Sequence, residues 1–197
     1  EKSRNLMTVR IAQDLGLKKI VKFSEQLGIY DNPSELLSIS LGSTETTLIK
    51  LTSAYSSFVN GGKLVKPIMI DRIQDSEGNT IFNNEKRKCI NCEHISHLSE
   101  NYPEIEDNFM QIFSSQTAYQ MTSILEGAIQ NGTGKNLKDL KLDLGGKTGT
   151  TNGNTDTWFI GFTSKLAVGV YVGSDNPRPL GKYETGAKTA LPIFKNF

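Results

Sequence analysis

The chain has 197 residues, which is enough for one domain with a continuous core or for the larger part of a bigger domain. Its 22 basic and 21 acidic residues nearly cancel, so no overall field directs it to nucleic acid or to an anionic membrane surface. No apolar run approaches the roughly 18 residues that span a bilayer, and residues 1–20 lack the order of a signal peptide. Any export signal or membrane anchor is therefore expected upstream of this chain or not at all.

Residues 1–60 are predicted to be mostly helical. Ser3 can cap a first helix whose apolar residues fall three and four apart as far as Gly16. A second helix follows and stops at Gly28, before a turn. A third is expected from about Glu45 to Val59, because its apolar residues keep helical spacing until Asn60-Gly61-Gly62.

The middle of the chain changes character. From Lys63 onward, β-branched residues in extended segments surround a turn at 76–79, which predicts a β-hairpin. Residues from about 84 to 113 are polar and irregular, so we expect them to form an inserted loop. Helical spacing returns over 118–129 and ends in Asn131-Gly132-Thr133-Gly134.

Three strands are predicted next, at 142–150, 157–163 and 166–172, and a final helical segment at about 185–197. Because the connections between the strands are short, neighbouring strands are expected to be antiparallel. Helices, then strands, then a helix packed on them predict an α+β layer fold.

Two cysteines, Cys89 and Cys92, lie close to His94 and His97. The second pair of possible ligands follows the first too closely for the usual zinc-finger spacing, so no metal is predicted. A redox Cys-x-x-Cys site needs a βαβ context that this segment lacks. We expect a local disulfide or two free thiols in an exposed loop, and no cofactor.

The sharpest local motif is Gly145-Gly146-Lys147-Thr148-Gly149-Thr150 on a predicted strand. Lysine and threonine together offer a fixed cation and hydroxyl donors for a carboxylate, while Gly149 lets a ligand approach the backbone closely. An ordinary edge strand with an exposed lysine is the alternative, because a Lys-Thr-Gly triplet also occurs by chance.

The motif lies in a longer stretch, residues 145–180, that resembles the end of the transpeptidase domain in class A penicillin-binding proteins. Residues 1–15, 48–62 and 116–134 are also similar to segments of that domain. The resemblance covers nearly the whole chain apart from about 84–113. It implies an antiparallel sheet with helices on both faces, incomplete at its N-terminal side, and one domain portion over 1–197.

The family's Ser-x-Asn element has three candidates here, at Ser3-Arg4-Asn5, at 99–101 and at 174–176. The triplet at 174–176 follows the Lys147 strand and precedes a proline, so it is interpreted as a turn. The triplet at 99–101 lies in the predicted insertion. Only Ser3 and Asn5 precede Lys147 in the family's order and start a helix, so we select them.

A Ser-x-x-Lys element does not occur in the sequence. In the mechanism that the resemblance implies, its serine attacks a D-Ala-D-Ala stem peptide, and an amine from a neighbouring stem resolves the acyl-enzyme. Family order places that element upstream, so we expect a truncated and by itself inactive chain. The uncovered part of the fold would be supplied by another copy, as a homodimer or domain swap, or the chain would be a product of cleavage or crystallisation.

The resemblance also implies roles for the residues that are present. Ser3 would relay a proton to the leaving group, Asn5 would hydrogen-bond the substrate amide, and Lys147 would sustain the electrostatics around Ser3. Thr148 and Thr150 would bind the terminal carboxylate, and the Thr150 N–H would be one oxyanion-hole donor.

Trp158, on the next strand, either lines the cleft or packs a helix onto the sheet. The expected partners are the peptidoglycan stem peptide and β-lactams, with no nucleic acid, and with a membrane only through an upstream anchor at the periplasmic face. Two alternatives stay open. One is a D,D-carboxypeptidase or β-lactamase-like hydrolase, and the other is a non-catalytic penicillin-fold binding module.

Overall fold

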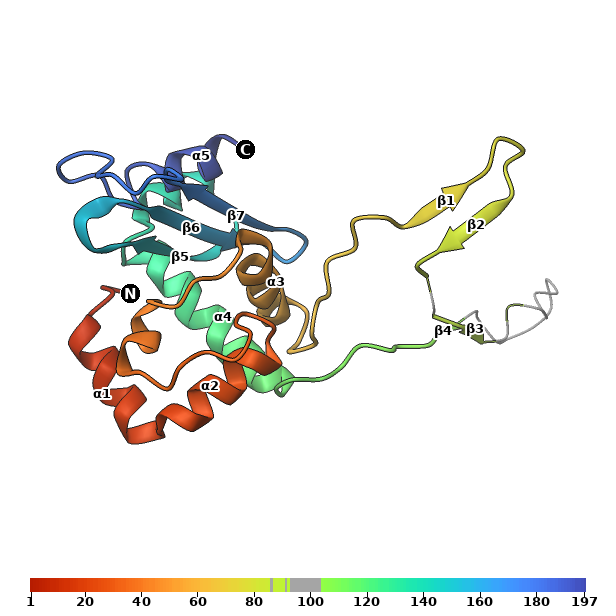
Figure 1. Ribbon diagram of the computed structural model, residues 1–197, viewed down its shortest axis with the longest axis horizontal. Coiled ribbons are helices and arrows are strands. Elements are labelled where there is room, and N and C mark those ends of the chain that lie inside the picture. The colour runs from red at the N-terminus through yellow and green to blue at the C-terminus, as the bar shows by residue number, and fades with distance from the viewer. Residues whose placement is uncertain (86, 91, 93–103) are drawn as a thin grey trace. The chain divides into compact units, whose positions relative to one another are not determined.

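A computed structural model of the chain describes residues 1–85, 87–90, 92 and 104–197. These residues form two compact units, one made of Glu1–Val65 with Gln111–Phe197 and the other of Lys66–Met110 (Figure 1). The expected insertion at about 84–113 falls mainly in the second unit, together with the hairpin that precedes it. The Ser-x-Asn triplet at 99–101, His94 and His97 lie outside the described residues.

The first unit begins with two short helices, α1 (Asn5–Leu15) and α2 (Leu17–Gln26). They meet at Gly16, whose φ of 93° ends the first helix where the sequence predicted. The prediction that Ser3 caps α1 is wrong. Arg4 occupies the N-cap position without a side-chain cap, and Ser3 has a φ of 51° with its hydroxyl engaged elsewhere.

Two longer helices follow after the 3₁₀ turn η1 (Leu37–Leu41). Helix α3 (Leu48–Val59) starts three residues later than expected because the Thr47 hydroxyl caps it, accepting from Lys50 N–H at 3.3 Å. Helix α4 (Ser115–Gln130) is capped in the same way by Ser114, and it leads through Gly132-Thr133-Gly134 into the 3₁₀ turn η3 (Lys135–Leu140).

The sheet of this unit consists of β5 (Gly145–Thr150), β6 (Thr157–Phe162) and β7 (Ala167–Val172), antiparallel and in that order. The 3₁₀ turn η4 (Asn152–Asn154) lies between the first two strands. All three strands and their antiparallel pairing confirm the sequence prediction.

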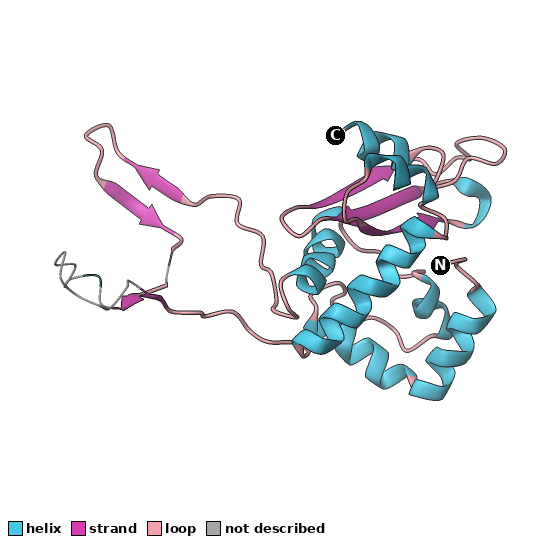
Figure 2. Ribbon diagram, turned by 180° about the vertical axis from the view of Figure 1, so that it is seen from behind, coloured by secondary structure: helices cyan, strands magenta, loops and turns pink. Residues whose placement is uncertain are grey.

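Helices cover both faces of the sheet, as expected (Figure 2). On one face, a Cβ added to Gly169 of β7 would collide with Thr52 of α3. On the other, a Cβ added to Gly161 would lie 2.7 Å from the ring of Phe194 in α5 (Ala190–Asn196). Helix α5 starts later than the expected 185, and Pro192 fits because it lies in the first turn.

The core lies between the sheet, α4, η3 and α5. Phe159 of β6 is fully buried and packs edge-to-face on Phe194, with ring centroids 4.8 Å apart. Its buried neighbours come from four further segments and are Ile129, Leu137, Leu144, Ala190 and Leu191. This cluster fixes β5 and β6 against the C-terminal end of α4, next to the candidate site.

The second unit contains the predicted hairpin, formed by β1 (Arg72–Gln74) and β2 (Thr80–Asn83). Its turn is held by Asp75, whose Oδ1 accepts from Glu77 N–H at 2.9 Å and Asn79 N–H at 2.8 Å. Hydrogen bonding to the carboxylate lowers the pKa of Asp75, and the largest contribution comes from the Asn79 side chain.

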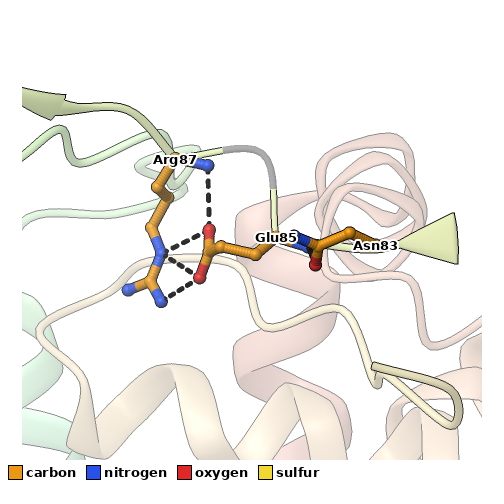
Figure 3. Close-up of polar contacts among 3 residues, drawn as sticks. All are labelled: Asn83, Glu85 and Arg87. Carbon is orange, nitrogen blue, oxygen red and sulfur yellow. Dashed lines mark hydrogen bonds and ion pairs between the residues drawn. The ribbon is translucent and has the colours of Figure 1, made fainter. Parts of the chain in front are cut away.

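Just after the hairpin, Arg87 bonds to Glu85, two residues before it (Figure 3). Arg87 donates from its backbone and from Nε to Glu85, at 2.8 and 2.9 Å. A two-residue ladder, β3 (Cys89–Ile90) with β4 (Glu104–Ile105), follows, and Cys89 is joined to Cys92 in a disulfide. This pairing is the first of the two alternatives that the sequence left open.

Within the described part of the chain, none of the helices combines the length and the hydropathy needed to cross a membrane.

Candidate functional site

The glycines at the start of β5 are explained by packing. A Cβ on Gly145 would enter the ring of Phe162, and one on Gly146 would lie 2.8 Å from the backbone oxygen of Ile160. Both positions are buried. Tight packing against β6 therefore holds β5 in place, and with it the motif residues Lys147 to Thr150.

Lys147 and Ser3 are 144 residues apart in the sequence and are brought together by the fold. The Lys147 ammonium donates to Ser3 Oγ at 2.9 Å and to the backbone oxygen of Thr148 at 2.7 Å. Lys147 is half-buried, and burial lowers the pKa of its ammonium because a charge is less well solvated there. None of the ion pairs between described residues involves Lys147. The arrangement is a partly desolvated cation whose proton points at a hydroxyl.

The two threonines of the motif lie on the other face of β5, because successive residues of a strand alternate. Thr148 Oγ1 lies 2.9 Å from the Thr133 hydroxyl, which follows α4. Thr150 Oγ1 accepts from the backbone N–H of Gly186 at 3.0 Å. The structure thus places Lys147 on one face of β5 and the two threonines on the other.

Gly149 is opposite Trp158 in the β5–β6 register, and the two share the Lys147 face. A Cβ on Gly149 would be 3.2 Å from Trp158 Cβ, a tight contact. Trp158 itself is half-buried and packs on Tyr171 of β7, with ring centroids 4.8 Å apart. Its nearest aromatic partner is thus a strand residue, and neither of the two expected roles is shown by this contact.

Asn5 is the predicted site residue that the structure does not link to the others. It is the first residue of α1 and is exposed, and its amide makes no hydrogen bond to any residue that the structure describes. It follows Ser3, the residue that meets Lys147, by two positions in the sequence.

Sequence reasoning missed two residues, Thr133 and Gly186, as partners of the motif threonines. The Gly-Thr-Gly after α4 was noticed only as a helix end. No local pattern marks Gly186. A Cβ at this position would lie 2.5 Å from the backbone oxygen of Trp158 and 2.6 Å from that of Gly149, so only the folded structure shows why glycine is required there.

The site is an open edge. Cavities of about 660 and 280 Å³ exist in this unit, but neither is lined by Ser3 or by a residue of β5. No strand among the described residues pairs with the outer edge of β5. A free strand edge offers backbone amide groups to an extended peptide, and the lysine and threonines offer donors for a carboxylate. The described residues contain no group of three His, Cys, Asp or Glu side chains that could hold a metal ion.

Comparisons with known proteins show which family the chain belongs to. Residues 1–197 match the family model described as penicillin-binding protein transpeptidase domain. Penicillin-binding protein 1A of Rickettsia bellii is 46% identical over 199 residues, covering 100% of this chain and 25% of that relative. The chain therefore spans about a quarter of the length of this curated relative.

Solved structures show the same fold. The crystal structure of penicillin-binding protein 1A from Haemophilus influenzae superposes with a TM-score of 0.81 at 31% identity, covering 99% of this chain and 33% of that one. Penicillin-binding protein A of M. tuberculosis, in its imipenem acyl-enzyme complex, superposes with a TM-score of 0.66 at 17% identity, covering 98% and 44%. The chain belongs to the penicillin-binding protein transpeptidase domain family.

Proposed function

We propose that this chain is part of a peptidoglycan D,D-transpeptidase, which cross-links stem peptides through an acyl-enzyme on a serine outside the chain. The observation that carries the proposal is the 2.9 Å hydrogen bond from Lys147 to Ser3, two residues 144 positions apart. It occurs in a chain that matches the transpeptidase family over its whole length. Because the sequence contains no Ser-x-x-Lys, the nucleophile and its lysine are assigned to another part of the same protein.

In this proposal Ser3 and Lys147 protonate the leaving group. When the acyl-enzyme forms, the terminal D-alanine leaves as an amine and needs a proton. Ser3 Oγ gives that proton and takes another from the Lys147 ammonium, whose lowered pKa favours release. Asn5 holds the substrate amide beside them.

The other side of the β5 edge binds the ligand's terminal carboxylate. Thr148 and Thr150 supply hydroxyl protons, and the Thr150 N–H is one donor for the oxyanion that develops during acylation. Gly149 leaves the backbone accessible between them. Trp158, opposite Gly149 in the register with β6, lines the cleft on the Lys147 face.

β-Lactams are the second ligand class that we assign, because they carry a carboxylate beside a reactive carbonyl. The imipenem acyl-enzyme of the M. tuberculosis relative supports this assignment. By the same likeness to 1A proteins, we assign the domain to the periplasmic face of the inner membrane, with the membrane anchor in another part of the protein.

The surface of α1 supports the view that this chain is completed by more protein. Four of its large apolar side chains are more than half exposed, namely Leu6 (64%), Met7 (51%), Ile11 (62%) and Leu15 (51%). We propose that the rest of the transpeptidase domain, or a second copy of the chain, covers them. Size-exclusion chromatography of the isolated chain tests this, and a stable, well-behaved monomer would contradict it.

Labelling with a fluorescent penicillin tests the function. We expect the full-length protein to be tagged covalently, its Ser-x-x-Lys serine→Ala variant to stay dark, and the isolated chain to stay dark. Product analysis with a stem peptide and an acceptor amine then separates the classes. Cross-linked product identifies a transpeptidase, release of D-alanine alone identifies a hydrolase, and no reaction of either ligand identifies a binding module.

A further inference from the structure

The hydroxyl pair formed by Thr133 and Thr148 joins the end of α4 to the β5 edge. The two oxygens are 2.9 Å apart and partly buried, and either atom could be the donor. A threonine hydroxyl has one proton and two acceptor lone pairs. The direction of this bond therefore decides whether the Thr148 proton is available to a ligand.

Thr150, on the same face of β5, shows how such a proton is kept available. Its partner is the backbone N–H of Gly186, at 3.0 Å, and an N–H can only donate. The Thr150 oxygen is thus held by an incoming bond, while its own proton stays free. The same arrangement at Thr148 requires that Thr133 be the donor.

The loop that carries Thr133 is held in place on both sides. A Cβ on Gly134 would lie 2.6 Å from Ile129 Cδ1 in the core, and Gly134 N–H donates to the Ala128 oxygen at 3.0 Å. A Cβ on Gly132 would lie 2.8 Å from that oxygen and would collide with the backbone oxygen of Glu1. Thr133 is therefore fixed between two close-packed positions, beside the segment that leads to Ser3.

We propose that Thr133 is a positioning residue that donates its hydroxyl proton to Thr148 Oγ1, so that the Thr148 proton points to the carboxylate of a bound peptide or β-lactam. The inference rests on the proposed function, since it assigns a support to the carboxylate site of that function. Thr133 does not touch the reacting atoms. Its effect passes through Thr148, and it should depend on the negative charge of the ligand.

The test uses the full-length protein and the second-order rate constant of acylation by benzylpenicillin and by its methyl ester. Thr133→Val keeps the shape and removes the hydroxyl. We expect acylation by the free acid to fall about five- to tenfold, the effect of losing one hydrogen bond, and acylation by the ester to change less than twofold. Thr133→Ser should restore most of the rate.

Two further variants separate positioning from folding. Thr122→Val is the matched control, because it removes another hydroxyl bond of α4, donated to the Phe58 oxygen at 3.3 Å, outside the site. It should leave both rates unchanged. In the Thr148→Val background, Thr133→Val should add little, since the two residues act through one contact. If the valine variant does not fold, Thr133→Ala takes its place.

The outcomes distinguish the two proposals. A wild-type protein that no penicillin acylates refutes the proposed function, and the role of Thr133 with it. A wild-type protein that is acylated, with Thr133→Val at the same rate, refutes only the positioning role. Equal losses for acid and ester, or full additivity with Thr148→Val, would also refute it, because they indicate a general structural effect.

Discussion

Replacing Lys147 by methionine separates the chemistry of the site from its packing. Methionine has a similar length and keeps the apolar part of the side chain, but it removes the ammonium and both of its bonds, to Ser3 Oγ and to the Thr148 oxygen. The half-buried position is retained. Any loss of activity would then come from the missing cation.

The expected magnitude follows from those contacts. A hydrogen bond from a charged donor contributes about 1.5–3 kcal/mol, so losing the Lys147 contact to Ser3 should slow acylation about 10- to 150-fold. Stability should change less, by under about 1 kcal/mol, because methionine also removes the cost of desolvating the ammonium that lowers its pKa.

The assay is the rate of acylation by a fluorescent penicillin in the full-length protein. Lys195→Met is the matched control. Lys195 is also partly exposed and is ion-paired, with Nζ 2.6 Å from Asp139 Oδ2, but it lies outside the site. Its replacement should leave the rate unchanged. A Lys147→Met variant that acylates within threefold of wild type would refute the reasoning.

The pH dependence carries an independent check on Lys147. Burial lowers the pKa of its ammonium below the ordinary value of 10.5. The rate of acylation should therefore begin to decline, on the alkaline limb of its pH profile, at a pH below 10.5. Between the folded and unfolded pKa values the unfolded chain binds more protons, so the free energy of unfolding should rise with pH in that window. Lys147→Arg, which stays charged, should remove both effects. An unchanged alkaline limb in that variant would assign the ionisation to another group.

Two further predictions concern Gly186, which contacts Thr150, and the buried Tyr55 of α3. A Cβ at Gly186 would lie 2.5 Å from the Trp158 oxygen and 2.6 Å from the Gly149 oxygen. Gly186→Ala should therefore displace the loop from Thr150 and lower the free energy of unfolding, measured with urea, by about 1–3 kcal/mol. An unchanged free energy of unfolding would contradict this close approach. Burial raises the pKa of Tyr55 to about 12 from 10.0, so stability present below pH 10 should be lost as the pH rises toward 12. Tyr55→Phe should remove that loss, and parallel pH curves for the two proteins would contradict the assignment.

Periodic patterns predicted most of the first unit. The helices around Leu48–Val59 and Ser115–Gln130 and the three strands of the sheet were expected from spacing alone. In each helix the apolar residues repeat with the helical period, and in each strand they alternate, so only one type of element places them all on one buried face. Errors occurred where single side chains decide, as at the start of α3, which the Thr47 hydroxyl sets.

The pairing of Ser3 with Lys147 required more than local pattern. Three Ser-x-Asn triplets were present, and only the order of elements in a known family selected the first. The capping role also given to Ser3 was wrong, since its φ of 51° turns it out of the helix start and its hydroxyl meets Lys147. Sequence reasoning gave Ser3 two compatible roles. The structure removes the capping role, and the proton relay stays a prediction.

Thr133 and Gly186 could not be predicted, because their importance exists only after folding. Their partners on β5 are 15 and 36 residues away, and nothing in either neighbourhood indicates a hydroxyl or an N–H aimed at a strand edge. Periodic sequence patterns indicate which face of a helix or strand is buried. They do not report single polar contacts between elements.

Strand alternation also limits where a further strand could join this sheet. Lys147 points to one face of β5 and the motif threonines to the other, so a ligand that meets all three must lie along the outer edge of this strand. A further strand paired there would exclude the ligand. In the order β5-β6-β7 the only other edge belongs to β7, among the strands that the structure describes. Under the proposed function, any additional strand is therefore expected to pair with Ala167–Val172, which leaves the β5 edge open for the ligand.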